Sequence, residues 1–141
     1  MHHGMNGRVA RPQGNRSQNM GPHGIYPCRG KDKWVAIAAK TAEEWAALCR
    51  ALGDPDWTKD ERFADLSKRI ANAAALDRHL AAWTANLDQY EAAHRLQAAG
   101  VPASPVLNTD GVFLDPHFTE RKVHIDYDHP VGGGIVVYNE P

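Results

Sequence analysis

The sequence has few cysteines and no long apolar run. Its two cysteines, Cys28 and Cys49, do not form a Cys-x-x-Cys spacing, so zinc or redox chemistry is disfavoured and core packing is their expected role. The longest apolar stretch, Trp34–Ala39, is far too short to cross a bilayer. No charged segment precedes a long apolar one, so we expect no secretory signal, no membrane partner and a cytoplasmic setting.

Neither sign of charge dominates the whole chain, whose net charge is −1, but the charge is unevenly spread. Residues 1–33 carry six basic side chains and one acidic side chain, whereas the remainder carries ten basic and sixteen acidic ones. The acidic globular part and the lack of aromatics within the basic stretch argue against a nucleic-acid partner. The Gly-, Asn- and Arg-rich residues 1–21 are predicted to form a basic arm or linker, with contact to ligand phosphates or an acidic partner as the alternative.

Residues 22–45, PHGIYPCRGKDKWVAIAAKTAEEW, carry the clearest structural pattern. Two apolar runs, Ile25–Cys28 and Trp34–Ala39, flank a polar turn that contains a glycine, which predicts a β-hairpin over about 24–39. Thr41 and Glu44 then have the spacing of a capping box, and they predict a helix that ends near Leu52.

The later segments predict several helices and then more strands. Helices are expected over about 66–73, 75–86 and from the Asp88 cap to Gly100, with single turns near 59–63 and 109–114, and extended segments over 103–107, 123–127 and 135–138. This order indicates an α+β fold in which several helices pack on one face of a small antiparallel sheet, preceded by an extended N-terminal arm. Residues 22–141 are expected to form one module.

The best metal-binding candidate is a strand with alternating polar residues. His124, Asp126 and Asp128 share one face of the predicted strand 123–127 and its extension, and His129 follows directly. The alternative is the solvated face of an outer strand, and we favour it, so no metal is expected. No Gly-x-Ser-x-Gly elbow or other nucleophile motif is present, and no catalytic residue is assigned.

Four blocks of the sequence resemble the small domain of family III CoA-transferases, which include formyl-CoA and carnitine CoA-transferases and alpha-methylacyl-CoA racemases. Besides residues 22–45, these blocks are GNRSQNM (14–20), RLQAAGVPASPVLNTDGVFLDPHF (95–118) and VHIDYDHPVGGG (123–134), in the order of the family. The resemblance implies a reaction that moves CoA from an acyl-CoA to a free carboxylate. In those enzymes the nucleophilic aspartate lies in a large domain to which nothing here can be matched.

The resemblance therefore implies a module that is inactive by itself. CoA or an acyl-CoA is the implied ligand, with no covalently bound cofactor, and a large-domain partner or a second copy is the implied protein partner. The family position of a glycine-rich loop over the active site falls at about 18–24, where Gly21 and Gly24 remain, so Gly21, His23 and Gly24 are the expected ligand contacts. Two alternatives remain open: a non-enzymatic binding or dimerisation protein, and a metal-dependent hydrolase that uses residues 124–129.

Overall fold

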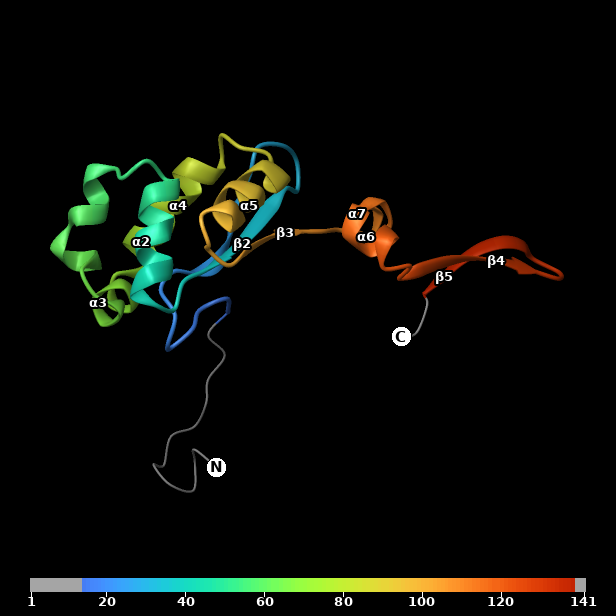
Figure 1. The fold of residues 1–141 in the computed structure, drawn as a ribbon, viewed down its shortest axis with the longest axis horizontal. Coiled ribbons are helices and arrows are strands. Elements are labelled where there is room, and N and C mark those ends of the chain that lie inside the picture. The colour runs from blue at the N-terminus through green and yellow to red at the C-terminus, as the bar shows by residue number, and fades with distance from the viewer. Residues whose placement is uncertain (1–13, 139–141) are drawn as a thin grey trace, which may run out of the picture. The chain divides into compact units, whose positions relative to one another are not determined.

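The computed structural model describes residues 14–138, and it divides the chain into two units, Met1–Val106 and Leu107–Pro141 (Figure 1). The first thirteen residues of the predicted basic arm lie outside the described residues. The elements in the first unit are β1 (His23–Pro27), β2 (Trp34–Ala38), α2 (Ala42–Ala51), η1 (Asp56–Lys59), η2 (Glu61–Phe63), α3 (Leu66–Ala71), α4 (Ala73–Thr84), α5 (Gln89–Ala98) and β3 (Ala103–Val106). The second unit contains α6 (Thr109–Leu114), α7 (Pro116–Glu120), β4 (His124–His129) and β5 (Gly133–Tyr138).

The first unit is built on a three-stranded antiparallel sheet with the strand order β1-β2-β3. The register places Tyr26 opposite Val35 and Gly24 opposite Ile37, so these residues share one face. Tyr26, Val35 and Ile37 are buried on that face, where α4 contacts β1 and α5 contacts β2 and β3 (Figure 1). The predicted α+β arrangement, with helices on one face of a small antiparallel sheet, is confirmed.

The opposite face of this sheet carries smaller or exposed side chains. His23 and Ile25 of β1 lie there, together with Ala36 and Ala38 of β2. Ile25 is 40% exposed although it is apolar. Because β1 is also an edge strand, residues 23–25 border both the open face and the edge of the sheet.

Local capping signals fix where the helices begin. The Thr41 side chain accepts a hydrogen bond from the Glu44 amide at 3.1 Å, and the Glu44 carboxylate accepts from the Thr41 amide at 3.0 Å, so the predicted capping box is confirmed. Asp88 caps α5 through the Tyr90 amide at 2.9 Å. The apolar faces of these helices close a single core that includes Leu48, together with the buried side chains of Phe63, Leu76, Leu80, Leu96 and Val101.

The second unit consists of two short helices and a hairpin. Asn108 caps α6, and Asp115 caps α7 by accepting from the His117 amide at 2.9 Å. The two last strands, predicted at 123–127 and 135–138, pair with each other as a separate two-stranded sheet. One face of this hairpin is apolar, and Tyr127 opposite Ile135 remains 47% exposed. No helix among residues 14–138 is long and apolar enough to cross a membrane.

Candidate functional site

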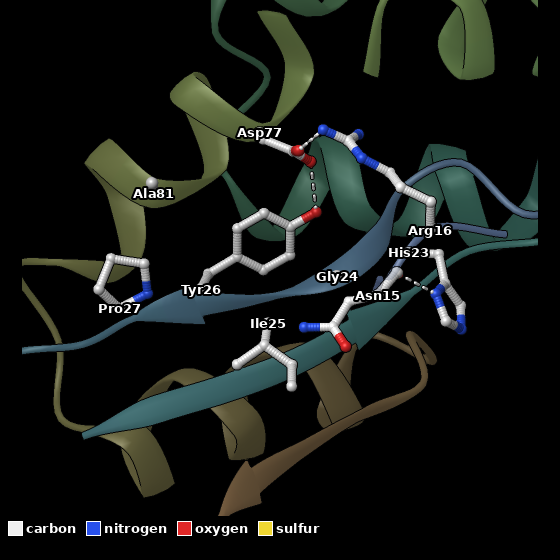
Figure 2. A pocket seen from close by; sticks show the side chains of 9 residues that line it. All are labelled: Asn15, Arg16, His23, Gly24, Ile25, Tyr26, Pro27, Asp77 and Ala81. Carbon is white, nitrogen blue, oxygen red and sulfur yellow. Dashed lines mark hydrogen bonds and ion pairs between the residues drawn. The ribbon is translucent and has the colours of Figure 1, made fainter. Parts of the chain in front are cut away.

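Two hollows adjoin strand β1. One has a volume of about 340 Å³ and lies between the strand and α4 (Figure 2). The other has a volume of about 320 Å³ and includes the small side chains Ala36 and Ala38 of the open sheet face. Both are lined by His23, Gly24 and Ile25 and by Asn15 of the irregular segment before the strand. The start of β1 therefore borders two candidate binding surfaces.

A partly exposed carboxylate and its two partners form one wall of the first hollow. The Tyr26 hydroxyl donates to Oδ1 of Asp77 at 2.9 Å, and Nη2 of Arg16 lies 2.6 Å from Oδ2 of the same carboxylate (Figure 2). Burial, followed by the negative charge of Asp77, raises the pKa of Tyr26 well above its usual value. Tyr26 is therefore a neutral hydrogen-bond donor at physiological pH, and it holds Asp77 on α4.

His23 presents a defined ring nitrogen at the junction of the hollows. Its Nδ1 lies 2.7 Å from the backbone carbonyl oxygen of Asn15. A carbonyl oxygen only accepts, so the proton of a neutral imidazole sits on Nδ1. The lone pair is then on Nε2, which can accept a hydrogen bond from a ligand or, when protonated, donate one.

The two glycines expected at the site have different surroundings. Gly24 lines both hollows, and a side chain there would meet the hydroxyl oxygen of Tyr26 at 3.0 Å from its Cβ. Gly21 is buried, and a Cβ would lie 3.2 Å from the Cβ of Arg69. His23 and Gly24 thus line both hollows, whereas Gly21 lines neither of them and packs against α3.

A buried arginine fastens the backbone that leads into β1. Arg69 of α3 is 3% exposed, and its guanidinium donates to the carbonyl oxygens of Gly21 at 2.8 Å and Phe63 at 3.1 Å. The same group lies 4.6 Å from the ring centroid of Trp45. Burial lowers the pKa of Arg69, although an arginine remains charged at physiological pH. The buried guanidinium of Arg69, which stacks on Trp45, therefore holds the backbone of Gly21 in place just before strand β1.

Neither cysteine is an activated nucleophile. Burial raises the pKa of the Cys28 thiol, with the charge of Asp88 as a smaller cause, and burial likewise raises the pKa of Cys49. A thiol with a raised pKa contains little of the nucleophilic thiolate. The side chains around β1 can bind and orient a ligand through hydrogen bonds, and neither cysteine supplies a thiolate nucleophile.

The strand with His124, Asp126 and Asp128 does not gain a further ligand from its neighbour. Across the hairpin, Val136 faces Asp126 and Gly134 faces Asp128. Nδ1 of His129 accepts hydrogen bonds from the amides of the following turn. Within residues 14–138, no three His, Cys, Asp or Glu side chains form a group that could hold a metal ion.

Sequence reasoning missed three residues that shape the site. Arg16 was grouped with a basic linker, and neither Asp77 nor Arg69 was distinguished from other charged residues on helices. Tyr26 and Asp77 are 51 positions apart, so no local pattern joins them. Arg69 lies on a short helix, and only the structure shows that its side chain is buried.

Comparison with known proteins agrees with this organisation. The sequence is 38% identical over 118 residues to the succinyl-CoA:mesaconate CoA-transferase of Haloarcula hispanica, a match that covers 84% of this chain and 28% of that protein. It is 31% identical over 135 residues to the succinyl-CoA–D-citramalate CoA-transferase of Chloroflexus aurantiacus, which covers 96% of this chain and 33% of that protein. The chain thus spans about a third of the length of these relatives.

Solved structures share the fold as well. A crystal structure of a CAIB/BAIF family protein from Brucella suis superposes with a TM-score of 0.77 and 28% sequence identity, covering 99% of this chain and 39% of that one. The sequence model of CoA-transferase family III matches residues 1–141. With matching sequence blocks, a matching fold and a match along its full length, this chain belongs to CoA-transferase family III.

Proposed function

We propose that this chain acts as the small-domain module of a CoA-transferase and that the surface around β1 forms one wall of an acyl-CoA cleft. The observation that carries the proposal is the meeting of the two hollows at His23 and Gly24, the residues expected to contact the ligand. Concave surfaces with an apolar lining and a few fixed polar groups are typical of ligand sites. The nucleophilic carboxylate would come from a large domain, in the same protein or in a partner.

In this arrangement the chain binds and orients the acyl-CoA but does not form the covalent intermediate. His23 would present Nε2 to a polar group of the ligand, since its Nδ1–H is committed to Asn15. Gly24 would offer its backbone to the ligand on the edge strand, where it lines both hollows. The purified chain is therefore expected to bind an acyl-CoA without transferring CoA.

The relatives suggest the kind of acyl group. Both carry succinyl-CoA in their names, and the acids mesaconate and citramalate are named as the other substrates. A succinyl group keeps one free carboxylate when its other carboxyl forms the thioester. We extend this substrate class, a dicarboxylic acid carried as its CoA thioester, to the present chain.

Calorimetric titration with CoA, acetyl-CoA and butyryl-CoA tests the binding role. Saturable binding is expected, and His23→Ala should weaken it about 3- to 10-fold, the effect of one hydrogen bond. His94→Ala, on the exposed side of α5, is the matched control and should leave the affinity unchanged. Absence of heat with all three ligands, or equal effects of the two variants, would contradict the proposal.

A second candidate function is dimerisation without catalysis, and the hairpin β4–β5 favours it. Ile125, Tyr127 and Ile135 share one face and are 40%, 47% and 43% exposed. A two-stranded hairpin is marginally stable alone, and an exposed apolar face is typical of an interaction surface. Sedimentation of the wild type and of Tyr127→Ser tests this: a dimer that the substitution converts to monomer supports it, and a monomeric wild type excludes it.

A further inference from the structure

The ion pair between Arg16 and Asp77 sits at the mouth of the first hollow rather than in the core. The Arg16 side chain is 42% exposed and that of Asp77 is 30% exposed. A guanidinium has five N–H groups, and the contact with Asp77 is made by Nη2. Arg16 therefore keeps N–H groups that the ion pair does not use, on a side chain that lines the hollow.

The two partners of Asp77 are held very differently. Tyr26 lies in strand β1 and is 3% exposed, so its hydrogen bond to Oδ1 is part of the packed structure. Arg16 lies in the irregular segment 14–22, before the first strand, on a long side chain. An exposed ion pair of this type contributes little to stability. Arg16 can consequently leave Asp77 at small cost, while Tyr26 still satisfies the carboxylate.

The lining of the hollow fits a short chain that ends in an anion. Ile25, Pro27 and Ala81 supply apolar surface, and Arg16 is the cationic side chain at the same hollow. Methylene groups prefer the apolar surface, whereas a carboxylate needs a charged donor when it leaves water. Arginine can bind a carboxylate through two parallel N–H groups, whereas Asp77 engages Arg16 through one oxygen.

We infer that Arg16 is the receptor for the free carboxylate of a dicarboxylic acyl group and that Asp77 occupies it until such a ligand binds. The inference rests on the proposed function for the CoA thioester and adds the residue that selects a charged acyl chain over a neutral one. Binding exchanges one carboxylate for another at the same guanidinium. Specificity then comes from the ligand's terminal charge, because a neutral chain cannot replace Asp77.

Small amides separate the terminal charge from the thioester. Succinamate ends in one carboxylate and carries a neutral amide in place of the thioester, and butyramide has a methyl group in place of the carboxylate. The titration follows the amide and Nε–H signals of Arg16 by NMR at constant ionic strength. We expect saturable shifts with succinamate and none with butyramide.

Two arginine variants show whether the site is specific. Arg16→Gln should weaken succinamate binding at least tenfold, whereas Arg29→Gln, an exposed arginine in the β1–β2 turn, should leave it unchanged. Asp77→Asn keeps the shape and the Oδ1 acceptor for Tyr26 but removes the competing charge, so it should tighten binding several-fold. Absent shifts, equal losses in both arginine variants, or weaker binding by Asp77→Asn would each overturn the inference.

Acyl-CoA binding is measured separately, so the two proposals can fail independently. Butyryl-CoA lacks the terminal carboxylate, so its binding tests the acyl-CoA cleft independently of any contact between a ligand carboxylate and Arg16. If butyryl-CoA binds but succinamate does not, the carboxylate receptor is refuted and the cleft stands. If succinamate binds at Arg16 but no CoA thioester binds, the carboxylate site stands and its assignment to an acyl-CoA is refuted.

Discussion

Replacing Arg69 by methionine is expected to loosen the backbone that leads into β1 while the fold persists. Methionine is similarly long and flexible, so it fills much of the same space, but it donates no hydrogen bond. The substitution leaves the carbonyl groups of Gly21 and Phe63 buried without the donor that now satisfies them. It also removes the contact between the guanidinium and Trp45.

The expected cost follows from these losses and one gain. A buried acceptor without a partner costs about 1–3 kcal/mol, and a desolvated cation–aromatic contact contributes about 2 kcal/mol. Removing a buried charge recovers desolvation free energy of several kcal/mol. The net loss for Arg69→Met is therefore expected to be about 3 kcal/mol, less than the usual stability of about 5–15 kcal/mol for a domain. The stability of Arg69→Lys should lie between those of wild type and Arg69→Met, since one ammonium group cannot donate to two carbonyl oxygens with the planar geometry of a guanidinium.

Urea unfolding and amide exchange measure the global and the local effect. The Ala39 amide donates to the Pro22 carbonyl at 2.9 Å, so it reports on the backbone that Arg69 holds. Its exchange should accelerate more than that of Val101, which donates to Leu96 at the end of α5. Arg62→Met, an exposed arginine paired with Asp60, is the control and should change stability by less than about 1 kcal/mol. Arg69→Met within about 0.5 kcal/mol of wild type, or unchanged exchange of Ala39, would refute the reasoning.

Three further changes test other contacts. Tyr26 has a raised pKa in the folded protein, so above pH 10 it ionises in the unfolded chain but stays neutral in the folded one. The stability advantage of wild type over Tyr26→Phe should therefore be full below pH 10 and shrink by about 1.4 kcal/mol per pH unit above it. Urea unfolding between pH 9 and 11 measures this change. Hydrogen bonds from Arg62 lower the pKa of Asp60 to about 2, so the Asp60 carboxylate stabilises the fold fully above about pH 4. This contribution is lost as the pH falls toward 2. The stability of Asp60→Asn should therefore fall less than that of wild type between pH 4 and pH 2. Thr41→Ala should cost about 1 kcal/mol in thermal or urea unfolding, and Ser67→Ala, on an exposed helical position, should cost clearly less.

The elements that could be predicted from the sequence are those whose causes are local. The hairpin between β1 and β2 is encoded by two apolar runs and a turn in which Gly30 has a positive φ of 112°. The capping box of α2 needs only four neighbouring positions. Helix α7 was missed although its signal is local, because Asp115 followed by Pro116 is a helix start.

The polar core of the site could not be predicted, because distant segments create it. Arg69 is an ordinary helical arginine in sequence, and its burial depends on Gly21, which lies 48 positions earlier. The contact of Asp77 with Tyr26 and Arg16 likewise requires α4 to lie beside β1. The family resemblance located His23 and Gly24 near the hollows, but it gave no reason to select the three charged residues.

The tight approach of Gly24 to Tyr26 restricts how this sequence can change over evolutionary time. A Cβ at position 24 would lie 3.0 Å from the hydroxyl oxygen and 3.1 Å from Cζ of the tyrosine, whose ring cannot move without leaving Asp77. Alanine at position 24 would therefore require the Tyr26 ring to shift by a few tenths of an ångström. The effects of substitutions at positions 24 and 26 are therefore expected to be coupled, so that the cost of Gly24→Ala depends on the side chain at position 26.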